Sequence, residues 1–158
     1  MNAQPTPQHD WLQQLVGTWT FESECIMGPD QPPTQSTGSE TVRSLGGLWT
    51  VGEGTSGDAN EKWSSIMTLG YDGKSAQFVG TFIASMIEHL WHYRGTLDAA
   101  QRVLTLDTEG PNFTDGSLIP YQDIIEIVGP NERTLTSRMR GPDGNWVQFM
   151  KATYRRQA

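Results

Sequence analysis

The sequence predicts an all-β fold, an up-and-down antiparallel barrel of about ten strands with a short N-terminal helix. Seventeen glycines and nine prolines in 158 residues indicate frequent tight turns. Between the turns, short segments alternate apolar and polar residues, which is typical of strands with one buried face. Beyond residue 17 no run has a helical period, so parallel strands would lack crossover helices. Closure into a barrel would remove the unpaired edges of this meander, and a two-sheet sandwich is the main alternative.

The N-terminal segment is expected to contain a flexible leader followed by one helix. Residues 1–9 are polar and include two prolines, so a single barrel domain is expected to cover residues 10–158. Asp10 can cap a helix over residues 11–16, and Gly17 can end it. The apolar residues of this helix share one side.

Ten segments are predicted to be strands. In the first of them every second residue from Trp19 to Met27 falls on one face. Gly-Gly and Asp-Gly pairs supply hairpin turns, whereas residues 28–36 and 109–117 are expected to be loops. The predicted strands cover residues 18–27, 38–45, 48–55, 63–71, 76–84, 87–97, 102–108, 120–128, 133–140 and 146–155.

Composition argues against several classes of partner. The net charge of −7, from 18 acidic and 11 basic residues, disfavours binding to nucleic acid or to anionic membranes. No apolar run approaches the ~20 residues of a membrane span, and the N-terminus lacks the pattern of a signal peptide. Cys25 is the single cysteine, so no intramolecular disulfide can form. These features predict a cytoplasmic protein.

The residues that open the first strand carry a resemblance. A short helix followed by Gly17, Thr18 and Trp19 resembles the start of calycin barrels, the lipocalins and fatty-acid-binding proteins. In those families the tryptophan packs across the closed end of the barrel, often near a basic residue from a late strand. The resemblance implies a calycin-like barrel here, with that basic role filled by Arg138, Arg140 or Arg155.

Motifs along nearly the whole chain resemble a second, narrower group. In order they include LVGTW, RSLGGLW, MTLGYD, HLW, LTLDTEGP, DIIEI and the closing YRR. Together they are similar to a bacterial family of unassigned function that is expected to form a lipocalin-like barrel. This resemblance implies a fold but no established activity, because fold alone does not give function.

Two of the three histidines lie three residues apart, but a strand places them on opposite faces. His92 shares a face with Glu88 and Arg94 and is expected to face water. His89 shares the aromatic face with Trp91 and is expected to point into the barrel. It could be an ordinary core histidine, a ligand contact or a single axial haem ligand. The spacing argues against a metal site built from both histidines.

Glu53 is the acidic residue with the most informative position. It alternates with Trp49 and Val51 between glycines, so we expect it either to point inward or to lie at a wet barrel rim. An inward carboxylate could grip a polar ligand or act as a general base beside His89. The chain contains no nucleophile elbow, phosphate-binding loop or dinucleotide fingerprint, and its acidic loop does not match a calcium-binding loop.

The preferred functional interpretation is a barrel that binds a small, largely apolar molecule. Proton transfer by His89 with Glu53 would make the protein an enzyme and is the first alternative. Haem binding through His89, or a homo-oligomer formed by exposed aromatic residues, are the others. No cofactor is specified. The residues expected to line the ligand site are Trp49, Glu53, Trp63, Met67, Phe82, His89, Trp91, Tyr93 and Tyr121.

Overall fold

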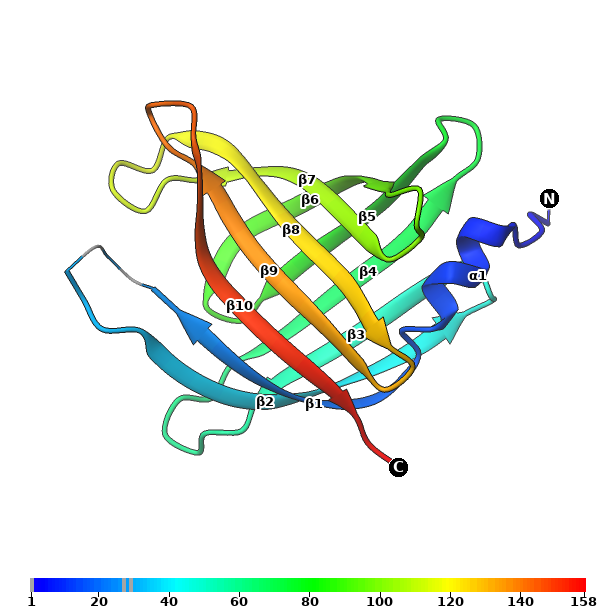
Figure 1. Cartoon of the computed structure of the whole chain (residues 1–158), viewed down its shortest axis with the longest axis horizontal. Coiled ribbons are helices and arrows are strands. Elements are labelled where there is room, and N and C mark those ends of the chain that lie inside the picture. The colour runs from blue at the N-terminus through cyan, green and yellow to red at the C-terminus, as the bar shows by residue number, and fades with distance from the viewer. Residues whose placement is uncertain (1, 27, 29) are drawn as a thin grey trace.

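The computed structural model describes residues 2–26, 28 and 30–158, and these form a closed antiparallel β-barrel with one helix (Figure 1). Helix α1 packs against β3 and β4 at one end of the barrel, and the β7–β8 and β9–β10 loops lie at the other end. The predicted fold class is therefore confirmed. The elements are α1 (Pro7–Gln13), β1 (Gly17–Cys25), β2 (Thr34–Leu45), β3 (Trp49–Ser56), β4 (Ser64–Asp72), β5 (Gln77–Ala84), β6 (Ile87–Leu97), β7 (Val103–Pro111), β8 (Leu118–Gly129), β9 (Glu132–Arg140) and β10 (Trp146–Arg156).

The barrel closes through β1. Each other strand pairs with its neighbours in sequence, whereas β1 pairs with β2 on one side and with β10 on the other. In register, Trp19 lies between Glu40 of β2 and Arg156 of β10. This closure excludes the two-sheet sandwich. The alternation predicted for the first strand is confirmed by buried Trp19, Phe21 and Ser23, while Met27 lies outside the described residues.

The helix begins earlier than predicted. It starts at Pro7, and the Thr6 backbone N–H donates to Nδ1 of His9 at 2.9 Å, which closes the first turn. Proline is favoured at the first helical position because its missing N–H has no helical partner there. Asp10 therefore lies within the helix rather than at its cap. His9, expected in a flexible leader, is buried and its Nε2 lies 3.0 Å from the Tyr71 carbonyl oxygen.

Several strands are longer than predicted, and two of them extend up to prolines. β2 begins at Thr34, directly after two prolines, and β7 continues to Pro111. Pro111 pairs with Leu118 of β8 at a point where β7 no longer pairs with β6. Proline is tolerated there because its position needs no N–H on the unpaired side. The expected loops at 28–36 and 109–117 are correspondingly shorter.

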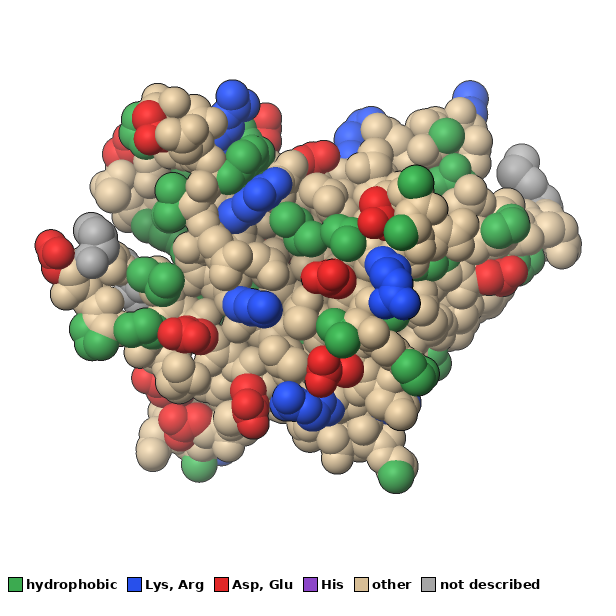
Figure 2. Space-filling view, in the orientation of Figure 1, with side chains coloured by type: hydrophobic (Ala, Val, Ile, Leu, Met, Phe, Trp, Pro, Cys, Tyr) green, Lys and Arg blue, Asp and Glu red, His purple; other side chains and the backbone are tan. Residues whose placement is uncertain are grey.

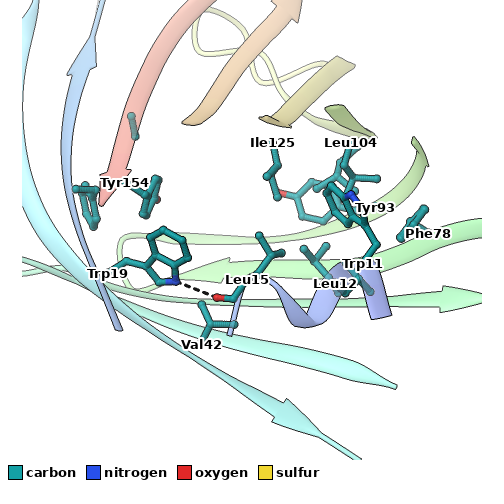
Figure 3. Close-up of a cluster of buried hydrophobic side chains, with 14 residues drawn as sticks. Trp11, Leu12, Leu15, Trp19, Val42, Phe78, Tyr93, Leu104, Ile125 and Tyr154 are labelled. Atoms are coloured by element: carbon teal, nitrogen blue, oxygen red, sulfur yellow. Dashed lines mark hydrogen bonds between the residues drawn. The ribbon is translucent and has the colours of Figure 1, made fainter. Parts of the chain in front are cut away.

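The hydrophobic core fills the end of the barrel that α1 covers. Trp11 and Leu12 of the helix and Leu15, two residues after its end, are buried in the core, and the indole N–H of Trp19 donates to the Leu15 carbonyl at 2.9 Å (Figure 3). Trp19 is 1% exposed. This hydrogen bond joins the first strand to the short turn that connects it to the helix.

The basic residues beside Trp19 are not the ones predicted. The guanidinium carbons of Arg133 and Arg156 lie 4.6 Å and 4.3 Å from the centre of the Trp19 ring. Arg133 is buried at the start of β9, near the end of the barrel that α1 covers. Of the predicted arginines, Arg140 and Arg155 are exposed, and Arg138 lies over the ring of Trp146. Among the described residues, none of the three predicted arginines lies over Trp19; these are Arg138, Arg140 and Arg155.

The prediction that Trp49 points inward is wrong, and of the two positions expected for Glu53 the structure contradicts the inward one. Both side chains are exposed, and β3 turns Thr50 and its glycines toward the interior instead. A Cβ placed on Gly52 would come within 3.2 Å of the Glu40 carboxylate, so the strand uses glycine where an interior side chain already occupies the space. The apolar alternation therefore marks the outer face of this strand.

The outer surface carries charges of both signs. Figure 2 shows acidic and basic side chains interspersed over β8, β9 and β10 on the face in view. Across these strands Arg138 donates to Gln122 at 2.8 Å, and Gln122 donates to Asp107 of β7 at 2.7 Å. Within the described residues, no helix has the length and hydrophobicity needed to cross a membrane.

Candidate functional site

The barrel wall is split between β6 and β7. Within residues 30–158, these strands pair only where Arg94–Leu97 faces Leu104–Asp107. β6 extends back to Ile87 while paired with β5, and β7 extends on to Pro111 while paired with β8. The facing edges of β6 and β7 therefore diverge beyond Arg94 and Asp107.

His89 bridges the split. Its Nε2 lies 2.8 Å from the Glu109 carbonyl oxygen on β7, and its ring meets the Trp91 ring edge-on with centroids 4.8 Å apart. Trp91 covers the inner side of β7, because a Cβ on Gly110 would overlap the indole ring. The split is thus bounded at one end by the last backbone pair and at the other by His89 and Trp91.

Removal of the His89 bridge is expected to loosen the split. In a His89→Ala variant, backbone amides of residues 87–93 and 108–111 should exchange with solvent about two to ten times faster, because a net hydrogen bond of ~0.5–1.5 kcal/mol is lost. Hydrogen–deuterium exchange with mass spectrometry measures this change. His92→Ala is the matched control, since His92 is exposed on the same strand. Equal exchange in both variants would contradict the bridging role.

A groove of about 580 Å³ opens at this split. Its volume lies in the ~300–1,000 Å³ range of small-molecule sites. The apolar part of its lining consists of Leu90, Leu118, Pro120, Tyr121 and Trp146. Polar groups surround this part and carry both signs of charge: His89, His92, Arg94, Asp107, Thr108, Glu109 and Arg140.

An array of aromatic rings supports one side of the groove. The Tyr121 ring lies edge-on to Trp91 at 5.0 Å and to Phe149 at 5.9 Å between centroids. The Tyr121 hydroxyl donates to the Pro111 carbonyl at 2.5 Å and so ties β8 to the end of β7. These edge-to-face contacts hold the rings in fixed orientations.

Thr108 is the buried polar residue of the groove. It is 9% exposed, and in the described part of the chain its hydroxyl oxygen has no hydrogen-bond partner. It pairs in register with Tyr121 on one side, while β6 has diverged on the other. Buried hydroxyls are normally hydrogen-bonded, so the Thr108 oxygen is an unsatisfied polar atom in the barrel wall beside the groove.

A hydrogen-bonded acid lies in the barrel interior near the split. The Ser137 hydroxyl donates to Asp123 Oδ1 at 2.6 Å, and the Tyr93 hydroxyl donates to Oδ2. Burial raises the pKa of the Asp123 carboxyl and raises the pKa of the Tyr93 hydroxyl well above its ordinary value. Asp123 was missed in the sequence, although it is a polar residue on the otherwise apolar face that contains Tyr121 and Ile125.

A second interior polar group is the ion pair of Arg133 and Glu40. The guanidinium donates to Glu40 Oε1 at 2.5 Å, and the two side chains are only 5% and 13% exposed. The guanidinium also stacks on Tyr154 at 4.0 Å from the ring centre. A cavity of about 20 Å³ adjoins this pair and Thr50, which is room for one water molecule.

The structure separates the predicted lining residues into three groups. His89 and Tyr121 line the groove. Trp49 and Glu53 lie on the outside of the barrel. The remaining ones face the interior, where they pack in the core or against the split, and they are Trp63, Met67, Phe82, Trp91 and Tyr93.

The proton-transfer pair suggested by the sequence does not form. Glu53 is exposed on the outer face, whereas His89 bonds to β7 at the split, so the two cannot act on one substrate atom. The same bond occupies His89 Nε2, so an axial bond to haem iron from this nitrogen would have to break the bridge. Among the described residues, no three side chains of His, Cys, Asp or Glu converge to hold a metal ion.

Residues 4–156 match a family described as "Protein of unknown function (DUF1579)". The chain belongs to the DUF1579 family. The expected membership of a family of unassigned function with a barrel fold is thereby confirmed. A search of curated protein sequences finds no match to this DUF1579 chain.

One solved structure supports the fold of this DUF1579 protein. It is similar to the crystal structure of Rv2717c from M. tuberculosis, with 13% identity, a TM-score of 0.67 and coverage of 98% of this chain and 100% of the other. A redesigned β-barrel shares 12% identity over 92% and 94% of the two chains, with a TM-score of 0.41. EF1p2_mFAP2b bound to DFHBI shares 15% identity over 94% and 98%, with a TM-score of 0.45.

Proposed function

We propose that this protein binds a small, largely apolar molecule in the groove at the split between β6 and β7. The observation that carries the proposal is an open groove of about 580 Å³ in which an apolar area, formed by Leu90, Leu118, Pro120, Tyr121 and Trp146, is bordered by polar side chains. An apolar lining with a few fixed polar groups is the usual composition of a small-molecule site.

The divergence of the two strands supports the interpretation that the groove is a ligand site and not an incidental depression of the surface. A closed barrel satisfies backbone groups by pairing every strand with its neighbours, so loss of pairing over half of a strand carries a cost. β6 and β7 lose their pairing beside the groove, whose lining combines apolar and charged side chains. A ligand seated in the groove would cover the diverging edges and recover part of this free energy.

Blocking the groove provides the direct test. Leu90 lies in the groove and is 45% exposed, so Leu90→Trp should fill the site with little effect on the core. We expect the Kd of 1-naphthol, measured by isothermal titration calorimetry, to rise about tenfold or more. Naphthol serves as a small, mostly apolar probe.

Ile66→Trp is the matched control, because Ile66 is 37% exposed on β4 and does not line the groove. This variant should bind naphthol as the unmodified protein does. Two results would contradict the proposed function. One is the absence of saturable naphthol binding to the unmodified protein, and the other is an equal Kd in both tryptophan variants.

A further inference from the structure

We infer that the groove binds an N-acylated amino acid amide, whose amino-acid unit pairs through two hydrogen bonds with the backbone of His92 on β6. The inference rests on the proposed function, because it names the chemical class of the small molecule for the groove between β6 and β7. It is carried by the direction of the backbone groups along the split, by the length of edge left unpaired, and by the charges and apolar side chains of the lining.

A hydrogen bond at the β6–β7 turn determines which backbone groups face the split. The Asp98 N–H donates to the Val103 carbonyl at 3.0 Å, so at this register position the backbone groups point between the two strands. Such positions recur at every second residue of an antiparallel ladder. In the same register Arg94 and Asp107 form the last pair. The N–H and C=O of His92, two residues back along β6, therefore point toward the same side.

His92 has no strand to pair with on this side, whereas the facing edge of β7 is occupied. In register His92 would oppose Glu109, but in the described strands the pairing ends before this position. The Glu109 carbonyl oxygen instead lies 2.8 Å from Nε2 of His89, and the Pro111 carbonyl accepts from the Tyr121 hydroxyl. Because His92 lines the groove, its N–H and C=O are directed at the bound molecule.

The length of unpaired edge limits the partner to one amino-acid unit. On one side of His92, Arg94 is already paired with β7. On the other side, the register between β5 and β6 shifts directly after the pair of Phe82 and Trp91. Such an irregularity interrupts the alternation of backbone groups along the edge. A longer peptide strand would need that alternation to continue, so a small molecule with one amino-acid unit fits the edge better.

The two backbone groups of His92 require two complementary groups on the ligand. In an antiparallel pair, the N–H and C=O of one residue exchange hydrogen bonds with the C=O and N–H of the residue opposite. An amino acid presents both groups in this arrangement when its nitrogen is acylated and its carboxyl is an amide. Besides two histidines, the lining carries two guanidinium groups and two carboxylates, those of Arg94, Arg140, Asp107 and Glu109. These four charges cancel, which favours a ligand with two neutral ends.

The apolar part of the lining accommodates the side chain and the acyl chain of the ligand. Residues opposite each other in an antiparallel pair place their side chains on the same face. His92 is exposed on the outside of β6, so the side chain of the bound unit lies on the outside as well. Leu90, Leu118 and Pro120 are exposed there and line the groove. Burial of CH₂ groups against them adds hydrophobic stabilisation to the two hydrogen bonds.

The ligand side of the pair is tested with N-hexanoyl-L-leucinamide and its depsi analogue, in which an ester oxygen replaces the leucine N–H. The analogue has nearly the same shape but cannot donate to the His92 carbonyl. Isothermal titration calorimetry should give a Kd about threefold to tenfold higher for the ester than for the amide, as expected for one net hydrogen bond. An equal Kd for the two probes, on a protein that binds 1-naphthol, would overturn the inference and leave the proposed function standing.

Two variants test the protein side of the pair. His92→Pro removes the backbone N–H at a position that is not paired with β7 in the described strands, where proline is tolerated, and should raise the Kd of the amide about threefold to tenfold. His92→Ala removes the imidazole but keeps the N–H, so it should leave this Kd unchanged. Equal rises in both variants would assign binding to the imidazole and overturn the inference.

The comparison of amide with ester uses the unmodified protein, so it does not depend on the folding of either variant. Failure of the amide to bind a protein that binds 1-naphthol would also overturn the inference alone. Failure of both the amide and 1-naphthol to bind the unmodified protein would overturn the proposed function, and the inference with it.

Discussion

Replacing Arg133 with methionine is expected to lower the free energy of unfolding by about 3–5 kcal/mol. The guanidinium is buried between Trp19 and Tyr154, and it is the partner of Glu40 in the interior of the barrel. Methionine preserves much of the volume but leaves the Glu40 carboxylate without its charged partner. The cost therefore comes mainly from a buried, uncompensated charge. Urea unfolding followed by tryptophan fluorescence measures it.

Two variants show whether the charge is the cause. Adding Glu40→Met to Arg133→Met removes the stranded carboxylate and should restore half or more of the lost stability, because a buried ion pair and an apolar pair of similar size are often about equal. Arg155→Met is the surface control. Its pair with Glu132 is exposed at 3.6 Å, so the expected loss is below about 1 kcal/mol. A loss this small for Arg133→Met would contradict the assigned role.

Replacing Asp123 with asparagine is expected to change how stability depends on pH. Burial raises the pKa of Asp123 in the folded protein above its unfolded value of about 3.9. Between these two pKa values the unfolded chain has lost the proton that the folded protein retains. The stability of the unmodified protein therefore includes a contribution that is fully present below about pH 4 and is lost as pH rises through the folded-state pKa.

Asp123→Asn lacks this titration. Its stability relative to the unmodified protein should therefore rise between pH 4 and pH 8, by about 1.4 kcal/mol for each unit by which burial raises the pKa. Urea unfolding at several pH values measures the difference. Asp72→Asn is a control in which the pH dependence should have the opposite sign, because hydrogen bonds from Ser75 and Lys74 lower the pKa of exposed Asp72. Its relative stability should fall as pH rises. A pH-independent difference for Asp123→Asn would show that the carboxyl is ionised in both states.

The strands could be predicted because they depend on local pattern. Alternation of apolar and polar residues, interrupted by turn residues, placed every one of the ten strands to within a few residues of its observed position. The largest errors lie at ends that prolines define, where β2 starts and β7 stops. There the outcome depends on whether a neighbouring strand needs the missing N–H, which the local sequence does not contain.

The candidate site could be predicted only in part. Alternation correctly turned His89 and Tyr121 inward, because the strands that carry them bury their apolar residues. The same rule failed for Trp49 and Glu53. The interior beside β3 is already filled by neighbouring side chains, with Glu40 and Val42 next to Gly52 and Ser65 next to Gly54. The neighbouring strand therefore decided which face of β3 is buried.

The sequence by itself determined the number, order and approximate extent of the strands and the presence of an N-terminal helix, since each follows from residues adjacent in the chain. Only the tertiary structure decided that Arg133 rather than a later arginine stacks on Trp19, that Asp123 meets Tyr93, and that β6 and β7 diverge. Those features depend on register across the closed barrel. Register is determined by how all ten strands pack together, and no single segment specifies it.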